Sequence, residues 1–182
     1  MSGGFRKLSE REVWSGHVIS VAEATFEAPD GSTFEREIVH HPGAVAVVPL
    51  LDDGRTALLV RQFRAALDDL VLELPAGKLD VDGEDPEAAA VRELAEEIGR
   101  RPTVVEELGR FYNTPGFCDE RGIIYLATGL VECDTSAQGV EETHMTIEEV
   151  DLDQVPAMVA DGRLQDGKSI IGLFLARERL RS

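Results

Sequence analysis

The chain is poor in cysteine, in aromatic residues and in positive charge. The scarcity of cysteine and of positive charge limits the classes of protein to which it can belong. Two cysteines, Cys118 and Cys133, cannot form the disulfide framework of a small secreted domain, so we expect a reducing, cytoplasmic location. Eighteen basic residues against 35 acidic ones give a formal net charge of −17, which argues against nucleic-acid and membrane partners. No apolar run has the length of a membrane span, and the first residues lack the apolar segment of a signal peptide.

The apolar content, by contrast, is sufficient for a core. With 182 residues, 43% of them hydrophobic, the chain suits one domain with a small appendage. Residues 13–39 favour β-strands around a turn at 29–32, and residues 40–43 look like a break before the rest. Residues 44–50 form a continuous apolar run, which is typical of a strand buried on both faces.

The remaining sequence alternates between strand-like and helix-like patterns. A hairpin turn at residues 52–55 leads to a return strand at 56–63. Residues 113–120 and 140–144 are expected to be loops. Further strands are expected near 71–74, 104–110, 123–130 and 145–150, and two closing helices near 153–160 and 168–179. This order predicts a mixed α/β layered domain.

Residues 86–98 carry the clearest helix pattern. Asp85 is a candidate N-cap, Pro86 suits the first helical position, and Gly99 stands where a C′ glycine belongs. Four apolar residues at helical spacing form one stripe that is expected to be buried: Val91, Leu94, Ala95 and Ile98. The helix therefore has an apolar back and an acidic front.

On the acidic front, Glu93 and Glu97 lie one above the other because they are four residues apart. Two stacked carboxylates repel each other unless a cation lies between them. A hard divalent ion fits, and Mg²⁺ typically binds a few carboxylates plus substrate phosphates. A solvated acidic face is the competing interpretation. Arg92 is expected to hold Glu84 or Glu96 in position rather than to contact substrate.

The segment that contains this helix, residues 77–100, closely resembles the Nudix box. That motif is Gly-x5-Glu-x7-Arg-Glu-U-x-Glu-Glu-x-Gly-U, where U is a bulky aliphatic residue, and the run from Glu84 to Gly99 matches in full. Six residues instead of five separate Gly77 from Glu84, and Arg100 stands at the last aliphatic position. Neither departure lies on the acidic side of the helix.

Outside the box, the chain resembles the ADP-ribose pyrophosphatase branch of the Nudix hydrolases, from about Trp14 to the last helix. Pro115 stands sixteen residues after Gly99, where that branch carries a proline. Other segments that look like the branch are residues 35–37, 41–45, 61–64, 73–77, 115–120 and 141–142.

This resemblance implies the fold and its division. The expected fold is an α/β/α Nudix sandwich with a mixed sheet over residues 43–182, preceded by a small N-terminal β subdomain over residues 1–42. In the resembling enzymes the N-terminal segment pairs with a partner chain and completes its substrate pocket, so we expect a homodimer, most simply with two-fold symmetry.

The resemblance also implies a divalent-metal site. Glu93, Glu97 and the backbone carbonyl of Ala76 are the expected ligands, and Glu96 is a ligand or bridging carboxylate. We expect Mg²⁺, with Mn²⁺ or another divalent ion as the alternative. The resemblance places the general base in the later acidic loop, where Glu142 matches best and Glu141 is the alternative. Glu142 is also expected to contact the metal. A base beside cationic metals is expected to be ionised at neutral pH.

Substrate-binding candidates lie in the matching segments on both sides of the box. Arg36 and Arg64 are expected to bind phosphate or terminal ribose, since guanidinium forks suit phosphate oxygens, whereas Arg61 is equally well a surface arginine. Glu120 is expected to accept hydrogen bonds from adenine or ribose, near Pro115. Aromatic residues are only 5% of the chain, and the sequence does not choose among three possible stacking partners for the base: Trp14, Phe26 and Phe117.

The leading hypothesis is a Mg²⁺-dependent Nudix pyrophosphohydrolase that cleaves ADP-ribose to AMP and ribose 5-phosphate. One alternative is another nucleoside-diphosphate-sugar pyrophosphatase, for example on GDP-mannose. A second is a non-catalytic ADP-ribose-binding sensor, which predicts a damaged box and an attached DNA-binding domain. A third, an enzyme that removes oxidised dNTPs, is disfavoured by Pro115 and the N-terminal segment.

Overall fold

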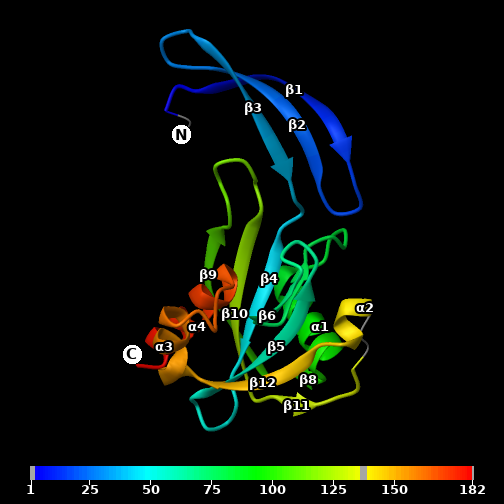
Figure 1. The fold of residues 1–182 in the computed structure, drawn as a ribbon, viewed down its shortest axis with the longest axis vertical. Helices are drawn as coiled ribbons and strands as arrows, with labels where there is room; N and C mark the ends of the chain where they lie inside the picture. The colour runs from blue at the N-terminus through cyan, green and yellow to red at the C-terminus, as the bar shows by residue number, and fades with distance from the viewer. Residues whose placement is uncertain (1–2, 136–138, 182) are drawn as a thin grey trace. The chain divides into compact units, whose positions relative to one another are not determined.

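The computed structural model of the chain describes residues 3–135 and 139–181 (Figure 1). It separates into two compact units. The first unit runs to Gly43 and adds the segment Tyr112–Arg121, and the second comprises Ala44–Phe111 and the chain from Gly122 onward. Within the described residues, no helix is both long and apolar enough to cross a membrane.

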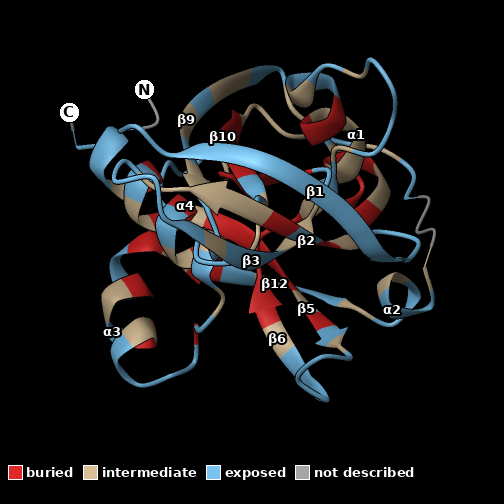
Figure 2. Cartoon of the chain, turned by 90° about the horizontal axis from the view of Figure 1, so that it is seen from above, coloured by how far each residue is buried: buried red, intermediate tan, exposed pale blue. Residues whose placement is uncertain are grey.

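The first unit is an antiparallel three-stranded sheet in the order β1-β2-β3, formed by Arg6–Ser15, Ser20–Glu27 and Thr33–His40. The expected turn between β2 and β3 is present: the Asp30 carboxylate accepts hydrogen bonds from the backbone N–H and the hydroxyl of Ser32, at 2.9 and 2.6 Å. Figure 2 shows that β1 is exposed along its length. The predicted β-rich N-terminal region is therefore confirmed.

The segment Tyr112–Arg121 is attached to β3 by backbone hydrogen bonds. The Val39 N–H donates to the Phe117 carbonyl at 2.8 Å, and the Asp119 N–H donates to the Val39 carbonyl at 3.1 Å. The His41 N–H also donates to the Asp119 carboxylate, at 2.9 Å. These bonds explain why a loop distant in sequence belongs to the first unit.

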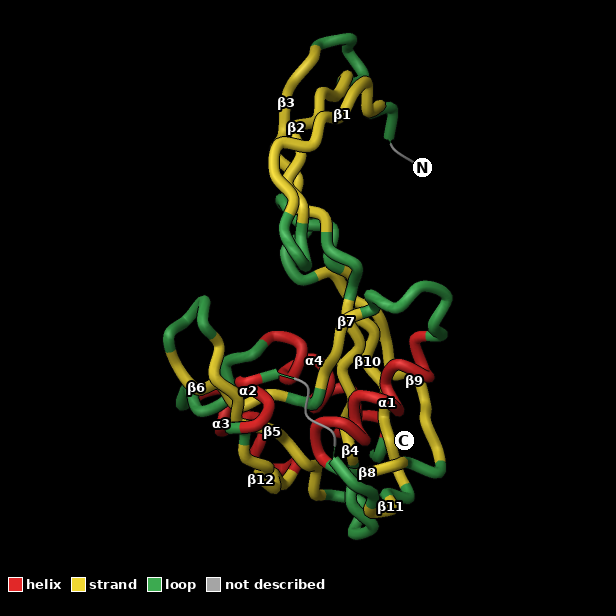
Figure 3. The backbone as a smooth tube through the Cα atoms, turned by 90° about the vertical axis from the view of Figure 1, so that its right-hand side faces the viewer, coloured by secondary structure: helices red, strands yellow, loops and turns green. Residues whose placement is uncertain are grey.

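The second unit contains two larger sheets, whose strands are among the yellow segments of Figure 3. One has the order β7-β4-β10-β9, in which β10 runs parallel and β7 antiparallel to β4. The other has the order β12-β5-β6 and is antiparallel. A two-stranded pair, β8 and β11, completes the unit. Their bounds are β4 Ala44–Pro49, β5 Thr56–Arg64, β6 Asp69–Glu73, β7 Ala76–Lys78, β8 Arg100–Arg101, β9 Val104–Tyr112, β10 Arg121–Thr128, β11 Val131–Glu132 and β12 Thr146–Asp151.

Helices cover the sheets and create two hydrophobic cores. The helices are α1 Pro86–Ile98, α2 Val140–Thr143, α3 Val155–Ala160 after a 3-10 turn at Leu152–Gln154, and α4 Gly167–Arg179. Along β4, Val45 and Val47 pack into the core that contains α1, whereas Ala46 and Val48 pack into the core that contains α3 and α4. The continuous apolar run is thus a strand buried on both faces, as predicted, and the expected α/β/α layering with a mixed sheet is confirmed.

The expected β-hairpin after β4 is wrong in its pairing. The turn is present, with the Asp53 carboxylate accepting from the N–H groups of Arg55 and Thr56 at 3.0 and 2.9 Å. However, β5 joins the other sheet, and the two strands meet only at a bridge between Leu50 and Ala57. Because β4 pairs with β10 on one edge and β7 on the other, it has no edge left for β5.

Two local expectations also need correction. Residues 140–143 form the short helix α2 rather than a loop. The predicted buried stripe of α1 differs at one position: Val91 is only half-buried, whereas Glu97, on the acidic front, is 8% exposed and belongs to the buried residues of the helix. The reason is β7, a three-residue strand too short to be recognised in the sequence, which packs against α1.

Candidate active site

Helix α1 has the ends that its sequence predicts. Asp85 is extended and its carbonyl accepts the Ala89 N–H at 3.0 Å, although its side chain makes no capping bond. Gly99 ends the helix in the left-handed conformation at φ 62°, and its N–H donates to the Ala95 carbonyl at 3.2 Å. A Cβ at Gly99 would lie 2.8 Å from the Cys133 carbonyl oxygen, so both the backbone angle and the available space require glycine.

The backbone of β7 lies directly against the carboxylates of α1. A Cβ at Gly77 would lie 1.9 Å from the Glu93 carboxyl group, so the absence of a side chain there makes room for Glu93. The Ala76 N–H donates to Glu97 Oε2 at 3.1 Å. The motif glycine therefore has a steric function, and it brings the backbone of residues 76 and 77 to the two expected metal ligands.

Arg92 is surrounded by carboxylates. Its Nε and Nη2 both donate to Glu84 at 3.0 Å, and its Nη1 donates to Glu93 at 2.8 Å and to Glu96 at 3.2 Å. The Glu84 hydrogen bonds, followed by the charge of Glu93, raise the pKa of Arg92 further above its usual range. This arrangement supports the expected positioning role for Arg92.

Burial makes the ionised form of Glu97 costly. Desolvation, together with the charges of Glu93 and Glu142, raises the pKa of Glu97 to about 8, against the hydrogen bond from Ala76, which lowers it. The pKa of Glu93 is also raised, first by burial and then by Glu96 and Glu142, although Arg92 opposes this. Glu93 thus lies within electrostatic range of three other carboxylates, those of Glu96, Glu97 and Glu142.

A divalent cation would relieve this repulsion, and the donors fit a hard ion. Carboxylate oxygens are the ligands that Mg²⁺ and Mn²⁺ use in proteins. Within residues 3–135 and 139–181, however, no three acidic, histidine or cysteine side chains are already gathered in metal-binding geometry. Arg92 instead pairs with Glu93 and Glu96. The carboxylates thus fit a divalent metal by donor chemistry and charge, although they are not gathered around one point.

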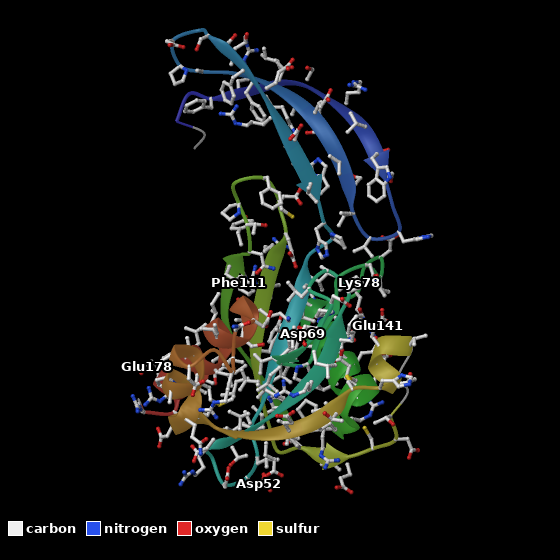
Figure 4. All side chains as sticks on the ribbon, in the orientation of Figure 1. Asp52, Asp69, Lys78, Phe111, Glu141 and Glu178 are labelled. Atoms are coloured by element: carbon white, nitrogen blue, oxygen red, sulfur yellow. The ribbon has the colours of Figure 1, made fainter. Side chains whose placement is uncertain are left out.

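The two candidate bases differ in their surroundings. Both are on α2, where Figure 4 labels Glu141. Glu142 is half-buried, accepts the Gly139 N–H at 3.2 Å and contributes to the raised pKa of Glu93 and Glu97. Glu141 is exposed. The structure therefore brings Glu142 into the electrostatic environment of the carboxylates.

Arg64 is close to this centre but is already paired. Its Nε and Nη2 each donate to the Glu73 carboxylate at 2.7 Å, and its charge acts to lower the pKa of Glu97. Glu73 and Lys168, which joins the same carboxylate, were not recognised in the sequence. For Glu73 the available signals were its place in the matching segment 73–77 and its acidic side chain at the end of an apolar strand pattern. Arg61 pairs with Glu148 across β5 and β12, which fits a surface role.

The remaining candidates belong to the first unit, where Arg36 and Pro115 line a pocket of about 490 Å³. The Arg36 guanidinium lies 4.8 Å from the centre of the Phe34 ring. Among the possible stacking residues, Phe26 and Phe117 line this pocket, whereas the ring of Trp14 packs beside Gly16. The other lining residues include Phe5, Phe34, Tyr112 and Asp119.

Glu120 does not line that pocket. Its carboxylate lies 4.0 Å from His41 Nδ1, and its N–H donates to the sulfur of Cys118 at 3.4 Å. Because the cluster of Glu93 and Glu97 is in the second unit and Glu120 is in the first, its expected role in substrate binding stays a prediction.

The sequence and fold decide the family. A family model for the NUDIX domain matches residues 40–170. The chain belongs to the Nudix family. It is 36% identical over 164 residues to the ADP-ribose pyrophosphatase of Bacillus subtilis (strain 168), an alignment that covers 90% of this chain and 88% of that protein. It is also 36% identical over 168 residues to the methanol dehydrogenase activator of Bacillus methanolicus, covering 92% and 90%.

The fold is also similar to that of a solved structure. The crystal structure of an ADP compounds hydrolase aligns with a TM-score of 0.85 over 97% of this chain and 94% of its own, at 22% identity. The Nudix fold and the resemblance to ADP-ribose pyrophosphatases are thus confirmed, and the chain is assigned to the Nudix pyrophosphohydrolases.

Proposed function

We propose that this Nudix protein hydrolyses the pyrophosphate bond of ADP-ribose to AMP and ribose 5-phosphate with Mg²⁺ bound, or with Mn²⁺ or another divalent ion in its place. The observation that carries the proposal is the cluster of Glu93 and Glu97 against the β7 backbone, where burial and neighbouring carboxylates make the ionised forms costly unless a cation is bound. The similarity to a protein named ADP-ribose pyrophosphatase supports the choice of substrate.

The bound metal would neutralise the diphosphate and lower the pKa of an attacking water. Glu93, Glu96, Glu97 and the Ala76 carbonyl would hold it, and Arg92 would keep the carboxylates in place. Glu142 would accept the proton of the water as general base, because it is half-buried and lies in the electrostatic range of Glu93 and Glu97. The reaction then needs no covalent intermediate with a side chain.

For the nucleoside, we propose the pocket of the first unit that Arg36 and Pro115 line. Its aromatic walls, Phe34 and Phe117, offer faces on which a base can stack. Arg36 is close enough to the Phe34 ring for a cation–π contact, which would hold its guanidinium near a stacked base. Two further contacts are proposed separately: Glu120, in the first unit, for hydroxyl groups, and Arg64, in the second unit, for phosphate.

We further propose that the protein is a homodimer formed through the first unit. Its strand β1 is a long, exposed edge strand, and such edges are usually paired or protected. Several large apolar side chains there are exposed, including Phe5, Leu8, Val13 and Trp14. Sedimentation equilibrium on the full chain should give twice the monomer mass, and a monomer at micromolar concentration would contradict the proposed dimer.

We also propose a reducing, cytoplasmic location, which is supported by the two cysteines, both free thiols.

The decisive assay measures the nucleoside monophosphate released from a panel of nucleotide sugars with Mg²⁺, AMP from ADP-ribose and GMP from GDP-mannose. ADP-ribose should be the best substrate. Strong turnover of GDP-mannose with none of ADP-ribose would change the substrate, and tight ADP-ribose binding without any turnover would favour a sensor.

The choice of base is tested with a matched pair on one helix. Glu142→Gln should reduce kcat by about 10²–10⁴-fold with little change in stability, whereas Glu141→Gln should retain most of the activity because that side chain is exposed. The reverse order of the two variants would assign the base to Glu141.

A further inference from the structure

A buried carboxylate in the second unit has two cationic partners, one on each of two other elements. Glu73, at the end of β6, is only 2% exposed. Arg64, at the end of β5, reaches both of its oxygens at 2.7 Å, and Lys168, in the first turn of α4, binds the same Oε2 that Arg64 Nη2 contacts. Burial alone would raise the pKa of Glu73, but the hydrogen bonds and charges of the two cations lower it. Glu73 is therefore ionised, and its carboxylate is shared between Arg64 and Lys168.

Lys168 is itself fixed in place by its neighbours. Its Nζ lies 3.0 Å from the carboxylate of Asp166, the residue that caps α4. Asp166 accepts the Ser169 N–H at 2.9 Å, and the fully buried Ser169 hydroxyl accepts the Leu74 N–H at 2.7 Å. The start of α4 is thus attached to the residue that follows Glu73. This anchoring leaves Lys168 little freedom to move away from Glu73.

The Arg64 end of this network lies within electrostatic range of Glu97. Glu73 occupies Nε and Nη2 of Arg64, and Nη1 is the remaining donor group, which carries no hydrogen bond to the described residues. The Arg64 side chain is 40% exposed, and its charge acts on Glu97. A guanidinium held on one edge by a buried carboxylate is pre-organised to donate from its other edge to an anion, and a phosphate oxygen is the natural acceptor.

We propose that Lys168 is a positioning residue for substrate: it fixes the Glu73 carboxylate, and through it orients Arg64 toward the phosphate of the nucleoside diphosphate sugar. This inference rests on the proposed function. Lys168 contacts no reacting atom and acts only through Glu73 and Arg64. Removing it leaves a buried carboxylate with one partner, so both Glu73 and Arg64 lose a fixed orientation.

The test compares Lys168→Met, Lys168→Arg and a control on the same helix, Arg179→Met, which removes an exposed ion pair with Glu106. For Lys168→Met, KM for ADP-ribose should rise roughly ten- to a hundredfold, the range expected for a lost hydrogen bond between charged groups. The Mg²⁺ dependence and pH profile should not change. Lys168→Arg should restore most of the affinity, and Arg179→Met should match the wild type.

A double-variant cycle separates positioning from a general structural effect. In an Arg64→Ala background, adding Lys168→Met should have no further effect on KM. If Lys168→Met raises KM by the same factor with and without Arg64, or leaves it unchanged in the wild-type background, the proposal is overturned. Should Lys168→Met fail to fold, Glu73→Gln with Lys168→Met removes both charges, and it should show the same rise in KM.

Calorimetric binding of ADP-ribose in EDTA distinguishes this proposal from the proposed function. If the wild type binds but does not hydrolyse ADP-ribose, the hydrolase assignment fails, while weaker binding by Lys168→Met alone still supports the positioning role. If the wild type hydrolyses ADP-ribose and Lys168→Met keeps its KM, only the positioning role fails. A wild type that neither binds nor hydrolyses ADP-ribose overturns both.

Discussion

At the scale of single residues, the site combines carboxylates whose ionised forms are each destabilising in the folded protein. Glu97 is buried with a pKa raised to about 8, and Glu93 is forced against the backbone of Gly77. Charged groups that are buried without full compensation reduce stability. Their presence together is typical of functional sites, where perturbed carboxylates gather.

The variant Glu97→Gln should therefore gain stability while it loses activity. Because burial raises the pKa of Glu97, the folded state favours the uncharged form, and an amide of the same shape imitates it. We expect the metal-free protein to be stabilised by about 1–3 kcal/mol at pH 8, with kcat lowered at least a hundredfold. Urea unfolding in EDTA measures the first effect. Glu87→Gln, at an exposed position in the first turn of α1, is the control, and an unstabilised Glu97→Gln would show that the charge is already compensated.

The pH response of the first unit depends on one histidine. His40 Nδ1 lies 2.6 Å from Asp119 and its Nε2 lies 3.2 Å from Glu10. The hydrogen bond with Asp119, opposed by desolvation, raises the pKa of His40 above its usual value. A raised pKa means that the contribution to stability is complete below about pH 6.5 and is lost as the pH rises through the folded-state value.

Amide hydrogen exchange can follow this loss locally. The Asp119 N–H, which donates to the Val39 carbonyl, should lose protection between about pH 6 and 8, by less than about tenfold because the pair is partly exposed. His40→Asn should remove the pH dependence, and His17→Asn, at an exposed turn residue, should retain it. Protection that increases with pH would contradict the assignment.

At the scale of elements, the site depends on how closely β7 approaches α1. The contact is possible only because Gly77 lacks a side chain. Secondary structure alone would not reveal this, since β7 has only three residues. The strand therefore contributes to function mainly by placing its backbone beside Glu93 and Glu97.

Gly77→Ala should separate catalysis from folding. The new Cβ would overlap the Glu93 carboxyl group, and because that group ends a flexible side chain, Glu93 can rotate away at modest cost. We expect about a hundredfold loss of kcat/KM from the displaced ligand but less than about 2 kcal/mol of destabilisation. Gly167→Ala, where a Cβ meets open space, is the control. Near wild-type kinetics for Gly77→Ala would mean that Glu93 is not a required ligand.

Sequence patterns predicted the structural features that depend on residues close together in the chain, and they missed the features that depend on residues far apart in it. The ends of α1 follow from Pro86 and Gly99, and the double burial of β4 follows from its composition. The pairing of β4 with β10 instead of β5 depends on competition for strand edges across the chain. Glu73 and Lys168 are 95 residues apart, so no local pattern connects them.

At the scale of the whole molecule, the two units can be observed separately. All helices of the described chain belong to the second unit, and the single tryptophan, Trp14, belongs to the first. Circular dichroism at helical wavelengths therefore reports the unit with the carboxylate cluster, and tryptophan fluorescence reports the other.

Magnesium should stabilise the second unit specifically. A ligand that binds only the folded state adds RT ln(1 + [L]/Kd), which is about 1–2 kcal/mol when free Mg²⁺ is about ten times its Kd. The thermal midpoint seen by circular dichroism should rise by a few degrees, while NaCl at equal ionic strength, which only screens the net charge of −17, should have less effect. In Glu93→Gln with Glu97→Gln the specific rise should vanish. If Mg²⁺ raises the midpoint of that variant as much as that of the wild type, the ion acts on the general charge and not on the proposed site.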